Sequence, residues 1–175
     1  TVAMEEAKKA LRQAQADRLC QLAKSGDLTS LKSALGESGG LDAVEVICSD
    51  TGNTPLVWAA ERGHLQCVEA LIEAGASVDG YGAEANTPLA RAARNGHVDV
   101  CDHLINNGAD IAAENSKNQS PLHLAAMANH EQVVHRLVEA KAPLFKKERK
   151  GRIPSMVTQS GNIREFLKGK ERIIQ

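Results

Sequence analysis

A motif that recurs every 33 residues constrains the fold of this chain more than any other feature of its sequence. The motif opens with Thr-Pro-Leu at 54–56, returns as Thr-Pro-Leu at 87–89 and as Ser-Pro-Leu at 120–122, and has a weaker copy beginning at Ile153-Pro154. A fixed period of about 20 to 50 residues indicates stacked structural units. Each unit of such a stack contacts only its neighbours, so we expect no single globular core.

Each copy of the motif predicts a helix, a tight turn and a second helix. The leading Thr or Ser is a suitable N-cap, and proline at the first helical position gives up no hydrogen bond. Leu-x-x-Ala-Ala follows, which predicts a slim inner helix. A turn residue comes next, Gly63, Gly96 or Asn129, and asparagine is the ordinary residue that best tolerates a left-handed backbone. A more apolar second helix then ends at Gly75 or Gly108, whereas the third copy has Lys141 at that position, which predicts a strained or altered helix end.

The two ends of the chain depart from the motif, as the caps of a stack do. Apolar spacing predicts a helix over 2–24 and a short second helix from Leu28 to about Gly36. The connection 36–49 is expected to fold its apolar residues back onto the stack; these are Leu41, Val44, Val46 and Ile47. The fourth copy lacks an N-capping residue and the alanine pair, so it is interpreted as a C-terminal cap.

The turn, Thr-Pro-Leu, Ala-Ala, Gly-His, the apolar helix and the closing Gly-Ala-x-Val/Ile resemble the ankyrin repeat across residues 17 to 167. The resemblance implies an all-α solenoid of helix–turn–helix units with projecting β-hairpin loops, capped at both ends. We predict one domain, 1–175. Its parts are an N-terminal cap and connection (1–48), full repeats (49–81, 82–114, 115–147), a degenerate capping repeat (148–169) and a tail (170–175).

Metal, redox and catalytic chemistry find no support in the residue pattern. Four cysteines, Cys20, Cys48, Cys67 and Cys101, lack the spacing of a zinc site or a redox pair, and we predict that they are buried thiols in a reducing compartment. His64, His97 and His130 recur with the repeat, and each is expected to hydrogen-bond its own turn to the next. The sequence has no Gly-x-Ser-x-Gly, phosphate loop or dinucleotide fingerprint. We therefore predict a non-enzyme with no cofactor and no metal.

Charge is distributed unevenly along the chain although the net charge is only −1. From Lys141 onward there are ten basic and three acidic residues, against eleven basic and nineteen acidic before it. The run 146–152 is basic and has three interpretations: a solvated hairpin tip, a nuclear import or polyanion-binding signal, or the basic end of a groove that selects an acidic partner segment. Aromatic residues that could stack on bases do not interleave with it.

No apolar run reaches the roughly 20 residues of a membrane span. A cytoplasmic monomer is predicted, with nuclear location as the alternative.

The resemblance implies that a partner protein binds the hairpin tips and the concave face of the inner helices. Carried onto this sequence, the predicted partner-binding residues are Asp50, Thr51, Asn53, Glu61, Arg62, Tyr81, Glu84, Asn86, Arg91, Arg94, Asn95, Lys117, Gln119, Met127, Arg149, Lys150 and Arg152. Trp58 and Arg91 share the register of Leu124; Trp58 is expected to pack against the N-terminal cap, and Arg91 to face the groove, reach the surface or lie over Trp58.

Two functions other than a protein-binding module are compatible with the sequence. The domain could target or regulate a larger enzyme or transporter, or the basic run could bind nucleic acid or acidic lipid. Charge reversal at Arg149, Lys150 and Arg152 is predicted to weaken partner capture without lowering the melting temperature.

Overall fold

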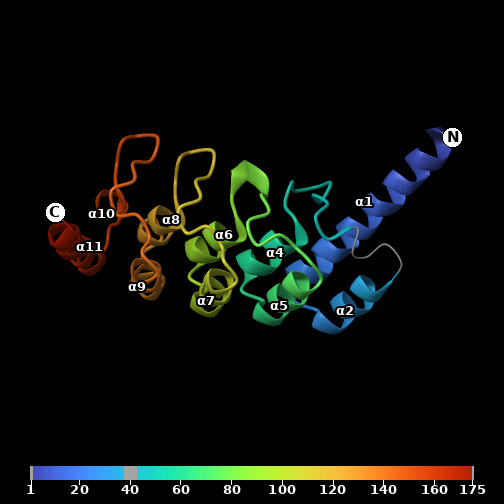
Figure 1. The fold of residues 1–175 in the computed structure, drawn as a ribbon, viewed down its shortest axis with the longest axis horizontal. Helices are drawn as coiled ribbons and strands as arrows, with labels where there is room; N and C mark the ends of the chain where they lie inside the picture. Colours follow the sequence, from blue (N-terminus) through green and yellow to red (C-terminus); the bar gives the residue numbers. More distant parts are fainter. Residues whose placement is uncertain (1, 38–42, 175) are drawn as a thin grey trace.

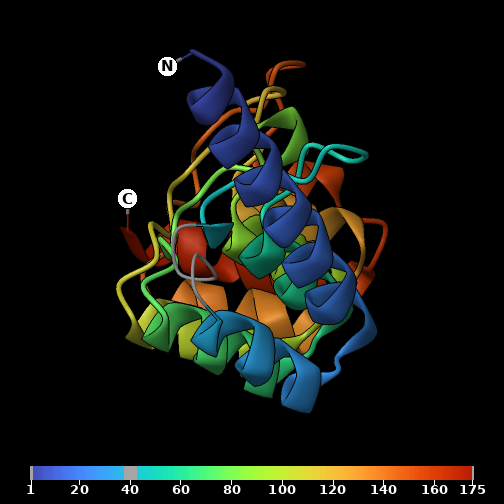
Figure 2. The same cartoon turned by 90° about the vertical axis from the view of Figure 1, so that its right-hand side faces the viewer.

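The computed structural model describes residues 2–37 and 43–174, and these form an elongated stack of helix pairs (Figure 1). Inner helices α1 (Val2–Ser25), α4 (Pro55–Arg62), α6 (Pro88–Asn95), α8 (Pro121–Met127) and α10 (Pro154–Val157) pack one against the next. Outer helices α2 (Leu28–Gly36), α5 (Leu65–Glu73), α7 (Val98–Asn106) and α9 (Glu131–Glu139) form a second layer, visible end-on in Figure 2. A 3-10 turn, η1, covers Ala83–Ala85, and α11 (Gly161–Ile174) closes the chain. The predicted all-α solenoid is confirmed.

The start and end of each inner helix follow the predicted chemistry. Thr54 and Thr87 accept a hydrogen bond from the third residue of their helices, at 3.3 and 3.2 Å. Gly63, Gly96 and Asn129 all adopt the left-handed conformation, with φ of 75°, 80° and 60°. Lys141 is also left-handed, with φ of 68°, in the position that glycine holds in the other repeats. Apart from Trp58, the side chains buried between layers are small or aliphatic, and all of them form one continuous cluster from Ala16 to Leu167.

Each repeat histidine links two repeats through its ring, but the bond runs to the preceding unit. The Nε2 atom of His97 donates to the carbonyl of Glu61 at 3.0 Å, and that of His130 donates to Arg94 at 3.0 Å. The rings also cover the turn glycines: a Cβ built on Gly63 would lie 2.5 Å from the Nδ1 of His97. Glycine is therefore required there both by its positive φ and by the ring above it.

The third turn is built differently because the capping repeat has no equivalent histidine. Asn129 fills the turn, and its Oδ1 accepts from the hydroxyl of Thr158 at 2.9 Å and from the backbone N–H groups of Gln159 and Ser160 at 3.2 and 3.0 Å. One asparagine side chain thus replaces the histidine link between the last full repeat and the C-terminal cap.

Three expectations about the ends and the cysteines differ from the structure. Cys20 and Cys48 form a disulfide that links α1 to the connection before the first repeat, because folding brings their Cα atoms within 6.3 Å of each other. The prediction of four buried thiols therefore holds only for Cys67 and Cys101. Helix α11 continues through Lys170, where a tail was predicted. Within the connection, Val44 is buried but Ile47 is half exposed, and Leu41 lies outside the described residues.

Candidate partner-binding surface

Hairpin-like loops project from the stack beside the inner helices, and neighbouring loops are joined to each other (Figure 1). The loops close with equivalent backbone bonds, from Gly82 to Asn86, Asn115 to Gln119 and Glu148 to Arg152. Between loops, Ser116 N–H donates to the carbonyl of Glu84 at 2.9 Å, and Arg149 N–H donates to that of Lys117 at 3.0 Å. The last three tips therefore form one hydrogen-bonded row, which holds their side chains in fixed relation.

A groove of about 660 Å³ lies between these tips and the ends of α6 and α8. We call it the concave groove, and define it by twelve lining residues: Glu84, Arg94, Asn115, Lys117, Gln119, Leu124, Met127, Ala128, Glu148, Arg149, Lys150 and Arg152. Eight of them are among the predicted partner-binding residues, and Ala128 lies beside Met127 at an inner-helix end that the sequence already places on the binding face; Asn115, Leu124 and Glu148 were missed. Leu124 could have been found from its shared register with Trp58 and Arg91.

The concave groove is cationic. Its lining has five basic and two acidic side chains, a net charge of three positive. Lys117 pairs with Glu84 at 3.1 Å, and Arg152 with Glu148 at 2.9 Å. A hydrogen bond from Lys117 lowers the pKa of Glu84, and one from Arg152 lowers the pKa of Glu148, so both carboxylates are ionised at neutral pH. Arg94, Arg149 and Lys150 supply the excess positive charge, and Met127, with 41% of its surface exposed, supplies an apolar contact.

The loop that carries Arg149 and Lys150 is anchored to the inner helix beneath it. His123 is fully buried, and its Nε2 donates to the carbonyl of Arg152 at 3.1 Å, while its Nδ1 accepts from Ser120 N–H at 3.3 Å. Burial lowers the pKa of His123, because a charged imidazolium would lose its hydration. The neutral ring with its proton on Nε2 is the form that fits both bonds.

Two asparagines predicted to contact a partner are structural, and we correct that prediction. Asn53 and Asn86 expose 4% and 3% of their surface. Asn53 accepts from Ala83 N–H at 2.8 Å, and Asn115 donates to Asn86 at 3.1 Å, so both lie in a polar ladder that runs beneath the loops. Gln119 lines the groove but is also mostly buried, with 8% of its surface exposed.

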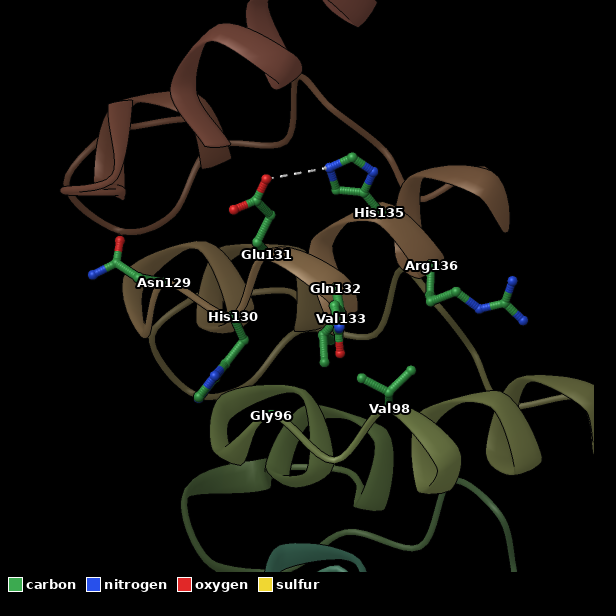
Figure 3. Close-up of a pocket in the computed structure, with 9 residues that line it drawn as sticks. All are labelled: Gly96, Val98, Asn129, His130, Glu131, Gln132, Val133, His135 and Arg136. Atoms are coloured by element: carbon green, nitrogen blue, oxygen red, sulfur yellow. Dashed lines mark ion pairs between the residues drawn. The ribbon is translucent and has the colours of Figure 1, made fainter. Parts of the chain in front are cut away.

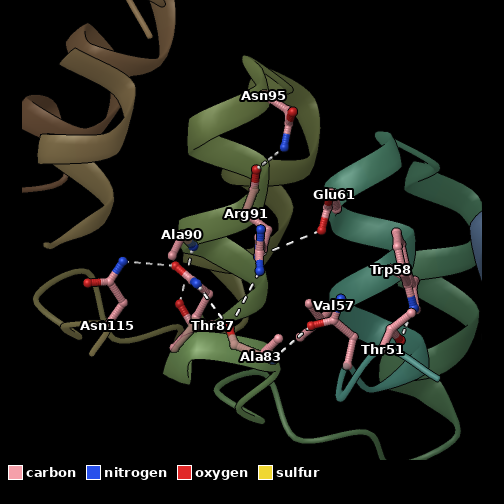
Figure 4. Close-up of polar contacts among 12 residues, drawn as sticks. Thr51, Val57, Trp58, Glu61, Ala83, Thr87, Ala90, Arg91, Asn95 and Asn115 are labelled. Atoms are coloured by element: carbon pink, nitrogen blue, oxygen red, sulfur yellow. Dashed lines mark hydrogen bonds and ion pairs between the residues drawn. The ribbon is translucent and has the colours of Figure 1, made fainter. Parts of the chain in front are cut away.

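The remaining predicted residues lie over the first two repeats and do not line the concave groove. Arg91 is mostly buried and forms an ion pair with Glu61 at 3.7 Å between α6 and α4, so it lies neither over Trp58 nor on the groove (Figure 4). Trp58 is buried as predicted, with Lys24 of α1 over its ring at 4.4 Å and Arg62 at 5.7 Å; its indole nitrogen donates to Thr51. Asp50, Tyr81 and Asn95 are exposed.

A second crevice, of about 790 Å³, lies between the start of α7 and α9 (Figure 3). His130 and Gly96 line it, and they form the inter-repeat link described above. None of the predicted partner-binding residues lines this crevice. Arg136, which does line it, is paired with Asp102 and Glu139. The crevice is therefore a by-product of the repeat junction.

Comparison with known families decides what this stack of helices is. A family model described as ankyrin repeats, in three copies, matches residues 19–115, and a single ankyrin repeat model matches residues 117–148. The chain is an ankyrin-repeat protein. The first match begins inside α1, so the family model includes the N-terminal helix pair as one of the repeats. No curated protein matches the chain.

Ankyrin repeats are generally protein–protein interaction modules, and the family is typically non-catalytic. Over the described ranges, 2–37 and 43–174, no helix is long and apolar enough to cross a membrane. Within the same ranges, no group of three or more His, Cys, Asp or Glu side chains is placed to hold a metal ion.

Proposed function

We propose that this ankyrin-repeat protein is a non-catalytic binding module that holds an acidic segment of a partner protein in the concave groove. The single observation behind the proposal is the composition of that groove: net positive charge beside the exposed Met127, on a row of hydrogen-bonded loops. A fixed framework lowers the entropy cost of binding, and complementary charge guides the choice of partner.

The basic run alone is a weaker candidate for binding nucleic acid. Lys146 pairs with Glu114 at 3.2 Å and Arg152 with Glu148 at 2.9 Å, so two of its five cations are already neutralised. Affinity for a polyanion grows with the number of phosphates neutralised, and this run offers few free cations. We place the protein in the cytoplasm, with the nucleus as the alternative, as part of the same proposal.

Reversal of Arg149 and Lys150 tests the proposal. Arg149→Glu/Lys150→Glu changes only exposed side chains. Arg152 must be left out, contrary to the sequence-based design, because Arg152→Glu would face a second carboxylate, Glu148, and destabilise the loop. Proteins captured from lysate, treated with nuclease, are compared between wild type, this variant and the charge-matched control Lys9→Glu/Lys32→Glu on α1 and α2.

Capture of specific proteins should fall strongly for the groove variant and stay at the wild-type level for the control. The melting temperatures of all three proteins should agree. If the groove variant captures the same proteins in the same amounts, the concave groove is not the binding surface.

A further inference from the structure

The outer layer of helices is interrupted at the C-terminal end of the stack. Helices α2, α5, α7 and α9 pack in sequence, but in the described residues α11 packs on α10 and diverges from α9 (Figure 1). The divergence leaves a groove of about 740 Å³ between the end of α9, the loop 141–146 and α11. This aromatic groove, defined by Val138, Lys141, Phe145, Phe166, Lys170 and Ile173, does not share a residue with the concave groove.

Apolar side chains that would normally be covered line the aromatic groove. The chain has two phenylalanines, one tyrosine and one tryptophan, and both phenylalanines are here. Phe145 exposes 44% of its surface and Ile173 exposes 79%. Phe166 is held in place by the ring of His135, stacked at 3.9 Å between centroids. Exposed apolar residues gathered in one concave place mark interaction sites more often than the same residues scattered over a surface.

The charges around the aromatic groove are positive. Glu139 and Lys146 also line the groove, and Glu139 is its one carboxylate among the described residues. Glu139 is paired with Arg136 at 3.0 Å, and Lys146 with Glu114 at 3.2 Å. Lys141 and Lys170 are exposed and have no carboxylate partner in the part of the chain that the structure describes. Lys170 lies 5.6 Å from the centroid of the Phe166 ring, so its ammonium group is at the apolar lining. An apolar side chain seated on Phe166 would therefore bring its sequence neighbours near lysine.

We propose that the aromatic groove is a second docking site, which takes a partner peptide with bulky apolar side chains flanked by aspartate or glutamate. The apolar side chains cover Phe145, Phe166 and Ile173, and the flanking carboxylates pair with Lys141 and Lys170. Aromatic and aliphatic anchors supply most of the binding energy in such contacts, and charge at the rim selects the partner. A membrane surface is a poorer occupant, because these apolar residues line a hollow.

Fluorescence anisotropy with a defined probe tests this site. The probe is a fluorescein-labelled peptide of three Glu-Leu-Phe-Asp units; a peptide with lysine in place of every acidic residue and a peptide with serine in place of every Leu and Phe are the comparisons. Protein variants are Ile173→Glu and Lys170→Glu in the groove. The matched control is Met156→Glu, which replaces another exposed apolar residue, with 62% of its surface exposed against 79% for Ile173, outside both grooves.

The acidic apolar peptide should bind wild type and Met156→Glu equally, and at least about tenfold more weakly to each groove variant, as expected when an anchor contact is lost. Both comparison peptides should bind far more weakly than the probe. Absence of probe binding to wild type would overturn the proposal, as would loss of binding in Arg149→Glu/Lys150→Glu instead of Ile173→Glu. Preferential binding to phosphatidylserine vesicles that Ile173→Glu abolishes would assign the groove to a membrane and overturn it equally.

Discussion

Asn129 offers the sharpest test of how this stack is closed. Asn129→Gly removes the Oδ1 that accepts three hydrogen bonds from the C-terminal cap, from Thr158, Gln159 and Ser160. A hydrogen bond contributes a net stabilisation of about 0.5–1.5 kcal/mol, and these three are partly exposed, so values at the lower end apply. The three together amount to about 2 kcal/mol.

Glycine also changes the backbone terms, and a second asparagine isolates them. Glycine adopts the left-handed conformation without strain, which stabilises the folded state, but it also has more conformational freedom in the unfolded chain, which destabilises the folded state. The two effects, each about 0.5–1 kcal/mol, nearly cancel. Asn118 is left-handed and exposed like Asn129, with φ of 57° against 60°, but within the described residues its side chain makes no hydrogen bond. Asn118→Gly is thus a control for the backbone contribution alone.

Urea unfolding followed by circular dichroism and hydrogen exchange measures the difference. We expect Asn129→Gly to lose about 2 kcal/mol relative to Asn118→Gly. Because units contact only their neighbours, the loss should concentrate in α10 and α11, where amide exchange should accelerate roughly 30-fold, the factor that corresponds to this energy. Amides in α6 and α7 should be unaffected. Equal stability of the two glycine variants would refute the assignment of Asn129 as the link to the cap.

Two further predictions concern a titrating residue and the cysteines. Burial lowers the pKa of His123 from 6.5, so the unfolded chain binds more protons than the folded one, and the free energy of unfolding should fall as the pH drops below about 6.5. In urea titrations between pH 7 and pH 5, His123→Asn should reduce this dependence of the unfolding free energy on pH. An unchanged dependence would contradict the assignment. For the cysteines, thiol labelling of denatured, unreduced protein should detect Cys67 and Cys101 only. Reduction should then destabilise the N-terminal cap by about 3–4 kcal/mol, from the 28-residue separation of Cys20 and Cys48, whereas labelling of all four thiols would show that the bond does not form.

The repeated part of the fold could be predicted because its determinants are local. Thr54, Gly63 and the residues between them specify a cap, a slim helix and a left-handed turn within one unit, and the 33-residue period places the units side by side. The Cys20–Cys48 pair and the Asn53–Asn86 ladder depend on how the connection and the loops fold across units. Spacing along the chain carries no signal for such contacts, so the cysteine pair was missed and the asparagines were taken for surface residues.

The candidate site was predicted only where exposure follows from position in the repeat. Arg149 and Lys150 are at a loop tip, and any hairpin there would expose them. Arg91 was placed on the groove although its partner, Glu61, is 30 residues away; the sequence shows two charges in variable positions, and only the stacked helices bring them to 3.7 Å. The aromatic groove could not be foreseen at all, because it arises from the divergence of α11.

The backward-reaching histidines have a consequence for how the array can grow. The histidine ring of every full repeat lies against a turn glycine of the preceding unit, where a side chain would clash with it. The first two full repeats in turn supply such a glycine, Gly63 and Gly96, to the repeat that follows. Units of this kind can be duplicated or deleted whole, since each new junction receives the same two parts. At Asn129 the series stops: a further histidine-bearing unit would find a side chain where its ring must lie. Adding another histidine-bearing repeat at this end of the stack therefore requires glycine at position 129.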